Sequence, residues 1–398
     1  MKKKEILNYL MKGDEADLLN LEPEVLGIIG VELKRRRLQQ SRTLDSFACG
    51  CSISYISKIE NGRINPKYSI LQELCNEQGI AKEELDCLIK INSFIEQAIV
   101  STFYGKHYEL NESCEQFENF DNYKVNLLRA LNYLNYHDYD DAKKMIESLE
   151  YVVDKLVPLD FNIFIYLKMM LLINDYKFLD AHKLYFRLKA IDNKILNTMC
   201  YKAYFIALCN CGLENPTHYY AALCKKYNEL LSVETNDVKK LYFETLVKLN
   251  YQLPEVIVGS MEIHYQIIYA YLHLDFEKLR KLYNLGLNAY DKLLIAMSLQ
   301  EYEIAQKCLL ELDYSKLKEK DNIIANLSKY IIEGHEMAMN QFIVNEAIPY
   351  AEERGDFSLL SFLVKFYSEK AMCTGKYKSV TSICISYFDL LEQYKRIY

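Results

Sequence analysis

Residues 52–63 read SISYISKIENGR, and this stretch decides the fold of the N-terminal part of the chain. Serine is a frequent N-cap of helices, and glycine frequently follows their last turn, so Ser52 and Gly62 predict the two ends of a short helix. The apolar positions recur at helical spacing: Ile53, Ile56 and Ile59. The opposite face carries polar and aromatic groups: Ser54, Tyr55 and Lys58. The pattern therefore predicts a helix with a buried side and a side free for contacts.

Helices are also expected on both sides of this stretch. Residues 27–39 carry apolar side chains at helical spacing. Thr43 is expected to cap a short second helix that runs through Phe47 and Ala48, and residues 50–52 form the following turn. A further short helix is expected over residues 68–76. The order of elements is a helix, a short helix, a turn and the helix over residues 52–63.

The charge of this region is opposite to that of the whole chain, which has a formal net charge of −7. Within residues 28–68, eight basic residues stand against three acidic ones, which gives +5. The basic residues are Lys34, Arg35, Arg36, Arg37, Arg42, Lys58, Arg63 and Lys67; the acidic ones are Glu32, Asp45 and Glu60. The density of the run 34–37 argues against a purely internal role for Arg37. A basic island on an acidic chain indicates a polyanionic partner for that island.

This arrangement is the one that reads the major groove of DNA: a short helix with a free polar face enters the groove, and the helix before it crosses the DNA backbone. Hydroxyl and basic side chains can reach base edges and phosphates. The expected base-side contacts are Ser52, Ser54, Tyr55 and Lys58; the expected phosphate contacts are Arg42, Thr43, Arg63 and Lys67, with Arg35 and Arg36 also toward the DNA backbone.

The run S-x-S-Y-I-S-K-I-E-N-G-R-x-x-P resembles the Cro/repressor (XRE-type) helix-turn-helix, and especially its version in the Rgg, PlcR and PrgX peptide-pheromone receptors. The resemblance covers residues 28–85. Two departures stand out: Leu44 occupies a position where the family usually has a phosphate-clamping Gln, and the segment 47–52 is one or two residues short. The resemblance implies a double-stranded DNA operator, a homodimer and a short peptide ligand. The alternative is a helical domain that kept the pattern and lost DNA binding.

The rest of the chain contains internal repeats. Residues 135–144 (NYHDYDDAKK) align with residues 174–183 (NDYKFLDAHK), 39 residues later. An aromatic residue three positions before a small one recurs at further sites: Tyr219/Ala222, Phe276/Leu279, Tyr302/Ala305 and, weakly, Tyr377/Val380. This resembles degenerate tetratricopeptide repeats, each a pair of antiparallel helices. We therefore expect an all-α chain in which a right-handed helical superhelix follows the helix-turn-helix.

Stacked repeats of this class form a concave surface lined by the first helix of each pair. Counting back from the small residue of each repeat indicates which side chains line this surface. Most of them are apolar and some are amides, a combination that suits an extended apolar peptide. The candidate peptide-binding residues are Asn135, Tyr166, Met170, Asn174, His264 and Tyr265. The competing interpretation is that these residues are inter-repeat core, and that the asparagines simply end their helices.

Other classes of function are disfavoured. The seven histidines are scattered, and no catalytic, phosphate-binding or dinucleotide motif occurs, so neither an enzyme nor a cofactor is expected. The twelve cysteines include no C-x-x-C pair, and those near residues 209–224 fit core positions better than a metal site. No apolar run could span a bilayer, and residues 1–10 do not resemble a signal peptide, so a cytoplasmic protein is expected without a membrane partner.

These observations predict four segments: an N-terminal extension (1–26), a DNA-binding helix-turn-helix (27–81), a rigid connector helix (82–110) and a repeat domain for ligand binding and dimerisation (111–398). The favoured hypothesis is a transcription regulator controlled by an intracellular signalling peptide, with the dimer interface near Tyr387–Tyr394. The alternatives are a protein-interaction module with a weak or vestigial head, and a phage- or plasmid-type repressor without a small ligand.

Overall fold

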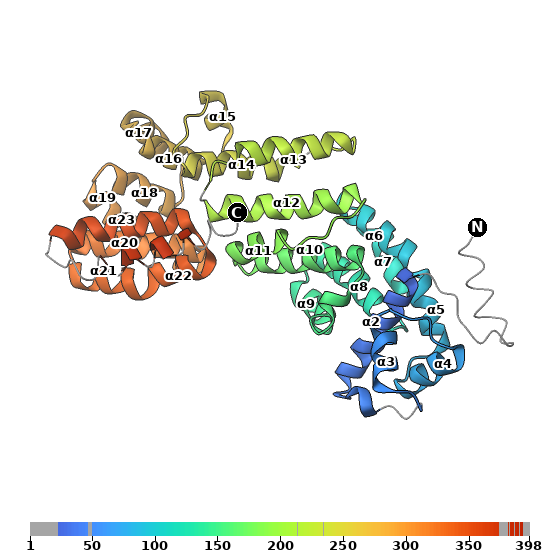
Figure 1. Cartoon of the computed structure of the whole chain (residues 1–398). Helices are drawn as coiled ribbons and strands as arrows, with labels where there is room; N and C mark the ends of the chain where they lie inside the picture. The colour runs from blue at the N-terminus through green and yellow to red at the C-terminus, as the bar shows by residue number, and fades with distance from the viewer. Residues whose placement is uncertain are drawn as a thin grey trace. The chain divides into compact units, whose positions relative to one another are not determined.

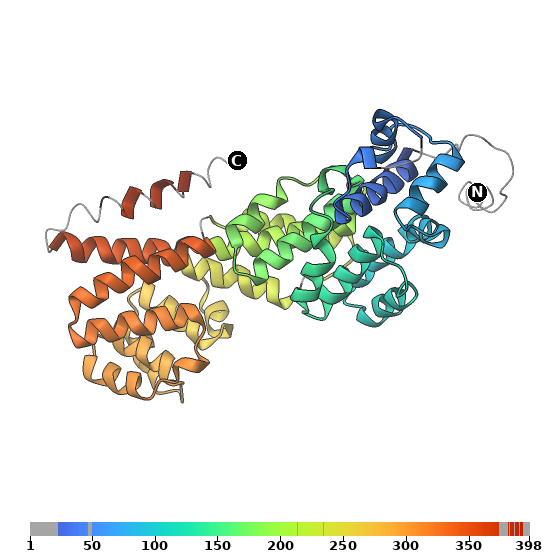
Figure 2. The ribbon, with the colours of Figure 1, turned by 90° about the horizontal axis from the view of Figure 1, so that it is seen from below.

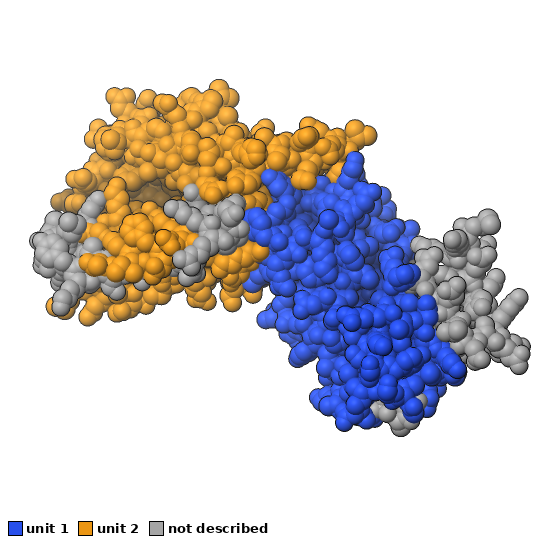
Figure 3. Space-filling model, in the orientation of Figure 1, with its two compact units in different colours: residues 1–174, 184–203 blue, residues 175–183, 204–398 orange. Residues whose placement is uncertain are grey.

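Helices are the only regular elements in the part of the chain that the computed structural model describes, which confirms the all-α prediction. The described residues are 23–46, 50–212, 214–233, 235–373, 381, 383–385, 387–389 and 391–392. They divide into two compact units (Figure 3), of which unit 1 is Met1–Asn174 with Leu184–Ala203 and unit 2 is Asp175–Lys183 with Tyr204–Tyr398. No helix of the described residues is long and apolar enough to cross a membrane.

The predicted helix-turn-helix region begins unit 1 and is called the head below (Figure 1). Its elements are α2 (Pro23–Gln39), η1 (Leu44–Ser46), α3 (Ile53–Glu60) and α4 (Tyr68–Glu77). The first, third and fourth agree with the sequence prediction, although α2 starts four residues earlier, at a proline suited to the first helical position. The second element is a single 3-10 turn, and Phe47 and Ala48 lie outside the described residues.

Glycines allow α2 to lie directly on the end of α3. A Cβ atom added to Gly30 would stand 2.7 Å from the carbonyl oxygen of Ile59 and 2.8 Å from that of Glu60. Gly62 has a φ of +63°, and a Cβ there would stand 2.9 Å from Gly27. The close approach buries apolar side chains from three helices in one core: Leu26, Ile29, Leu33, Ile56, Ile59, Leu71, Leu74, Cys75 and Ile80.

The expected single connector helix over residues 82–110 is divided among two helices and the start of a third, at His107. α5 (Lys82–Lys90) and α6 (Asn92–Tyr104) meet at Ile91, which is fully buried. No glycine or proline stands at this point, so the sequence offers no sign of the break. α5 packs against α2. The other helices wholly in unit 1 are α7 (His107–Glu115), α8 (Tyr123–Asn135), α9 (Tyr139–Glu147) and α10 (Pro158–Asn174).

Helices of unit 2 follow one another in short succession (Figure 2, yellow to red). They are α13 (Thr217–Glu229), α14 (Asn236–Lys248), α15 (Glu255–Ser260), α16 (Ile263–Leu272), α17 (Phe276–Tyr283), α18 (Ala289–Ser298), α19 (Tyr302–Leu310), α20 (Glu319–Glu333), α21 (Glu336–Phe342), α22 (Ile348–Arg354) and α23 (Phe357–Cys373). α12 (Lys194–Cys211) crosses the boundary of the two units, and α11 (Phe178–Tyr185) lies mainly in unit 2. α16 packs on α17, and α18 on α19.

The same turn recurs at four of the aligned sequence positions. A non-glycine residue with φ between +56° and +60° stands two residues before the aromatic: His137, Tyr176, Leu274 and Gln300. The small position of each motif is at most 1% exposed: Ala142, Ala181, Leu279 and Ala305. The pair Tyr219/Ala222 does not follow this pattern, because the next residue, Leu223, takes the buried position. Tyr377 and Val380 lie outside the described residues.

Candidate nucleic-acid interface

Both ends of α3 are fixed by local hydrogen bonds. The backbone N–H of Tyr55 donates to the Ser52 hydroxyl oxygen at 3.2 Å, which is the predicted N-cap. At the other end Gly62 N–H donates to the Ile59 carbonyl and Arg63 N–H to the Lys58 carbonyl, each at 2.9 Å. This pair of bonds is the Schellman motif, which the left-handed glycine makes possible. The Ser52 hydroxyl keeps its own proton free to donate outward.

The orientation of α3 differs from the prediction at two residues. Ile56 and Ile59 are buried in the head core as expected, whereas Ile53 is 53% exposed. Tyr55, expected on the outer face, is half-buried and packs against that core. The three isoleucines are spread over about 120° of the helix, since each step of three residues turns by about 300°. The core covers only the part of this arc that contains Ile56 and Ile59.

Arg37 is internal, which corrects the expectation drawn from the density of the basic run. Its guanidinium donates from Nε to one Glu60 carboxylate oxygen at 2.7 Å and from Nη2 to the other at 2.8 Å. Arg37 is 8% exposed and Glu60 is 4% exposed. A third nitrogen donates to the Arg42 carbonyl at 3.0 Å. This bidentate pair ties the end of α2 to the end of α3 and holds the two helices of the motif at a fixed angle.

Arg35 and Arg36, predicted to lie toward the DNA backbone, are held by internal partners in the structure. Arg35 is fully buried, where it donates twice to Glu32 and, at 2.7 Å, to the carbonyl oxygen of Asp121. Arg36 is paired with Glu32 and Glu84 and also donates to the Asp121 carbonyl. Burial raises the pKa of Glu84, and the positive charge of Arg36 opposes that rise. Both arginines are thus occupied by the neighbouring Glu32 and by acceptors from distant parts of the sequence.

The same cluster fastens the head to the rest of unit 1. The buried Glu32 carboxylate on α2 accepts from the backbone N–H of Tyr123, at the start of α8, at 3.1 Å. The Tyr123 hydroxyl in turn donates to Asp160 on α10 at 2.8 Å, and Lys124 pairs with the same carboxylate. All of these side chains except that of Arg36 are buried. The head is therefore fastened to α8 and, through Tyr123, to α10 within unit 1.

Two further predicted phosphate contacts have internal partners. Arg42 donates to the Glu77 carbonyl at 2.8 Å and pairs with its carboxylate at 3.4 Å. Thr43 is exposed, but its hydroxyl hydrogen-bonds the Asp45 carboxylate, and this bond lowers the pKa of Asp45. Arg42 and Thr43 shape the turn before α3, and neither presents a free donor comparable with those on α3.

Exposed cations remain at the predicted surface. Lys58 on α3, Arg63 just after it and Lys67 before α4 are all exposed. Within the described part of the chain, no ion pair engages any of the three. Ser52 and Ser54 are exposed as well. We take these five residues as the candidate interface, because they combine free positive charge with hydroxyl groups at one end of the head.

The predicted peptide contacts of unit 1 lie in different environments. Asn135 is the last residue of α8, half-buried, and its amide donates to the Thr102 hydroxyl at 3.3 Å. Tyr166 is 8% exposed and Met170 is half-buried on α10, whereas Asn174 ends that helix and is exposed. Asn135 and Met170 are thus only partly accessible, and Tyr166 is almost inaccessible.

In unit 2, His264 and Tyr265 begin α16 and lie among charged and aromatic groups. The His264 ring is 3.3 Å from an Asp291 carboxylate oxygen and stacks on Tyr290, with ring centroids 6.0 Å apart. The Lys248 ammonium stands 5.7 Å from the centroid of the Tyr265 ring. Burial, followed by the charge of Glu244, raises the pKa of Tyr265. This environment is more polar than the apolar groove that was predicted.

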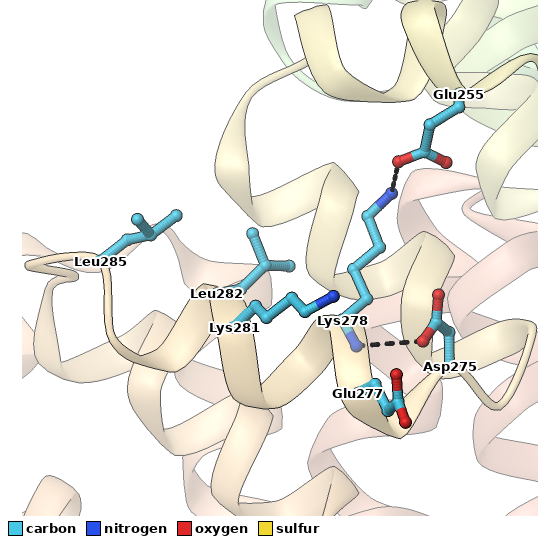
Figure 4. Close-up of a pocket in the computed structure, with 7 residues that line it drawn as sticks. All are labelled: Glu255, Asp275, Glu277, Lys278, Lys281, Leu282 and Leu285. Carbon is cyan, nitrogen blue, oxygen red and sulfur yellow. Dashed lines mark hydrogen bonds and ion pairs between the residues drawn. The ribbon is translucent and has the colours of Figure 1, made fainter.

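A cavity of about 450 Å³ in unit 2 is lined by neither of these residues (Figure 4). Its lining is charged on one side and apolar on the other: Glu255, Asp275, Glu277, Lys278, Lys281, Leu282 and Leu285. An ion pair between Lys278 and Glu255 crosses it, and the Lys278 backbone N–H is capped by Asp275. Five of its seven lining residues are charged, which does not match an extended apolar peptide.

Within the described residues no three His, Cys, Asp or Glu side chains are arranged to hold a metal ion. Cys209 and Cys211 are buried in α12, and burial raises the pKa of Cys209 to about 12. A protonated thiol in the core is a packing group and not a ligand.

Comparison with protein families identifies the head. A family model described as a helix-turn-helix domain matches residues 28–87. Residues 28–87 form a helix-turn-helix domain. The match supports a DNA-binding regulator in general terms and agrees with the caps of α3 and the helix order described above. No curated protein and no solved structure matches the chain.

Proposed function

We propose that the chain is a transcription regulator that binds double-stranded DNA as a homodimer through α3 and is controlled by a short intracellular peptide. The outer face of α3 is the observation that carries the DNA-binding part. It presents Ser54 and Lys58 to solvent while Arg37 and Glu60 hold the helix from behind. Such a helix can enter the major groove without rearrangement, which keeps the entropic cost of binding low.

Binding to DNA is tested by its salt dependence. Counterion release makes the logarithm of affinity fall with the logarithm of salt concentration, with a slope of about −0.9 per neutralised phosphate. If Lys58, Arg63 and Lys67 each neutralise one phosphate in both heads of a dimer, the slope is about −5. A random pool of duplexes, selected on the full chain, supplies the preferred site. Absence of salt-dependent binding would favour the alternative, a protein-interaction module with a vestigial head.

Control by a peptide is supported by the recurring turn of the helical pairs and by the resemblance of the head to the pheromone-receptor version of the motif. Asn135, Tyr166, Met170, Asn174, His264 and Tyr265 remain the proposed contacts, with Tyr166 the least accessible of them. Dimerisation near Tyr387–Tyr394 is likewise a proposal, and residues 390 and 393–394 of that stretch lie outside the described part of the chain.

The peptide proposal is tested by adding short apolar synthetic peptides to the complex of the full chain with its selected DNA site. If a peptide controls the chain, it changes the affinity for DNA by some factor. DNA must then change the affinity for the peptide by the same factor, because coupling between two sites is reciprocal. If no peptide changes DNA affinity while salt-dependent binding persists, the chain acts as a repressor without a small ligand. Light scattering that shows only monomer well above the DNA-binding concentration would contradict the dimer.

A further inference from the structure

Ile53 is a large apolar side chain that was expected on the buried side of α3 and is exposed in the structure. It is 53% exposed, and it directly follows the N-cap Ser52. Helical geometry places it within about 140° of arc together with Ser54 and Lys58, both of which are exposed. Ile56 and Ile59, by contrast, are 1% and 3% exposed in the core. Ile53 therefore contributes nothing comparable to the stability of the head.

An apolar group at this place has a specific complement in DNA. Thymine is the base that presents a methyl group in the major groove, beside the O4 acceptor, and apolar side chains contact that methyl. Residues in the first turn of the inserted helix are those that come closest to base edges in this motif. The neighbouring Ser52 and Ser54 hydroxyls can hydrogen-bond acceptors, whereas Ile53 offers only van der Waals contact and exclusion of water.

We propose that Ile53 is a specificity-determining residue that reads the C5-methyl group of a thymine in each half-site. This inference rests on the proposed DNA-binding function and adds a base preference to it. The contact requires the methyl group alone, so deoxyuridine, which lacks the methyl and keeps O4, distinguishes it from hydrogen bonding to the same base pair. Loss of one buried methyl group corresponds to about a fourfold change in affinity.

The test begins with the preferred site that the wild-type full chain selects from random duplexes. Each thymine of that site is then replaced in turn by deoxyuridine, and affinities are measured for wild type, Ile53→Ala and Ile53→Val. We expect one thymine per half-site at which wild type binds the uracil version about fourfold more weakly. Ile53→Ala should bind both versions equally, and Ile53→Val should retain part of the difference.

Two controls separate this contact from a loss of fold. Val256→Ala truncates an exposed β-branched residue of unit 2, 86% exposed, and should leave the thymine–uracil difference unchanged. Ile53→Ala should bind a duplex unrelated to the selected site as tightly as wild type does, because its phosphate contacts are intact. A selected site without a methyl-sensitive thymine, or a difference that persists in Ile53→Ala, would overturn the inference. Absence of salt-dependent binding to any duplex would overturn the proposed function itself.

Discussion

The buried pair of Arg37 and Glu60 should be the main polar determinant of the head's stability. Replacing Arg37 with Met leaves the Glu60 carboxylate, 4% exposed, without its two charged donors at 2.7 and 2.8 Å. Hydrogen bonds to charged groups contribute about 1.5–3 kcal/mol each, and breaking a buried ion pair costs about 3–5 kcal/mol. We expect Arg37→Met and Glu60→Leu each to lower the free energy of unfolding of the head by about 3–5 kcal/mol.

The double variant gives the sharper test of the reasoning. When both partners become apolar, neither charge is left buried and unpaired, so the double variant should be less destabilised than either single one. If the pair acts only through its separate contacts with other groups, the two effects should instead add. A double-mutant cycle with simple additivity, or single variants that cost less than about 1 kcal/mol, would refute the interpretation.

Hydrogen exchange of the full chain, followed by peptide mass, is the suitable assay. The chain has no tryptophan and 34 tyrosines, so tyrosine fluorescence would not isolate the head. A loss of about 3 kcal/mol speeds exchange of α2 and α3 amides by about two orders of magnitude, since each 1.36 kcal/mol is tenfold. Lys144→Met breaks an exposed pair with Asp141 on α9 and serves as the matched control, with no measurable change expected.

Three more outcomes are expected. Gly30→Ala should destabilise the head by about 1–3 kcal/mol through contact with the carbonyls of α3, whereas Gly27→Ala, whose Cβ would meet Val157 at an ordinary 3.5 Å, should not; equal exchange rates in the two variants would contradict this. Removing the charge of Arg63 or Lys67 should reduce the salt slope by about 1 per head for every DNA sequence tested, and an unchanged slope would exclude that phosphate contact. Burial lowers the pKa of His182 to about 4, so the neutral ring is favoured in the fold and stability should fall as pH falls from about 6.5 to about 4. Denaturation of His182→Leu should show less of this loss, by up to about 3 kcal/mol, and an equal pH dependence would refute it.

Local signals in the sequence were sufficient for the elements of the head. Ser52 and Gly62 act within one turn of the ends they determine, and the actual bounds of α3 follow from them directly. The small residues of the repeats could be predicted equally well, because the burial of Ala142 and Ala305 depends on a neighbouring helix that is close in sequence. At these positions residue type and spacing predicted the structure.

The roles of the arginines could not be predicted in this way. Arg35 and Arg36 both pair with Glu32, and Arg36 also pairs with Glu84, while the carbonyl of Asp121 accepts from both arginines. Glu84 and Asp121 are distant in sequence, so a charge count over residues 28–68 overestimated the positive charge available to DNA. Ile53 fits the spacing of its neighbours, and only the extent of the head core shows that it is left outside. The break between α5 and α6 at Ile91 likewise leaves no mark in residue type.

The way the head is attached restricts how a ligand could control it. Glu32 joins α2 to the start of α8 through Arg35 and the Tyr123 amide, all of them buried. Opening such a charged cluster costs several kcal/mol, whereas the coupling free energy between two sites is typically about 1–3 kcal/mol. A peptide bound to the repeat helices therefore lacks the energy to detach the head from α8. In the proposed mechanism the peptide would instead move the head together with α8 and so change the distance between the two heads of the proposed dimer. Because half-sites are read about one helical turn apart, a shift of a few ångströms is enough to favour or disfavour the operator.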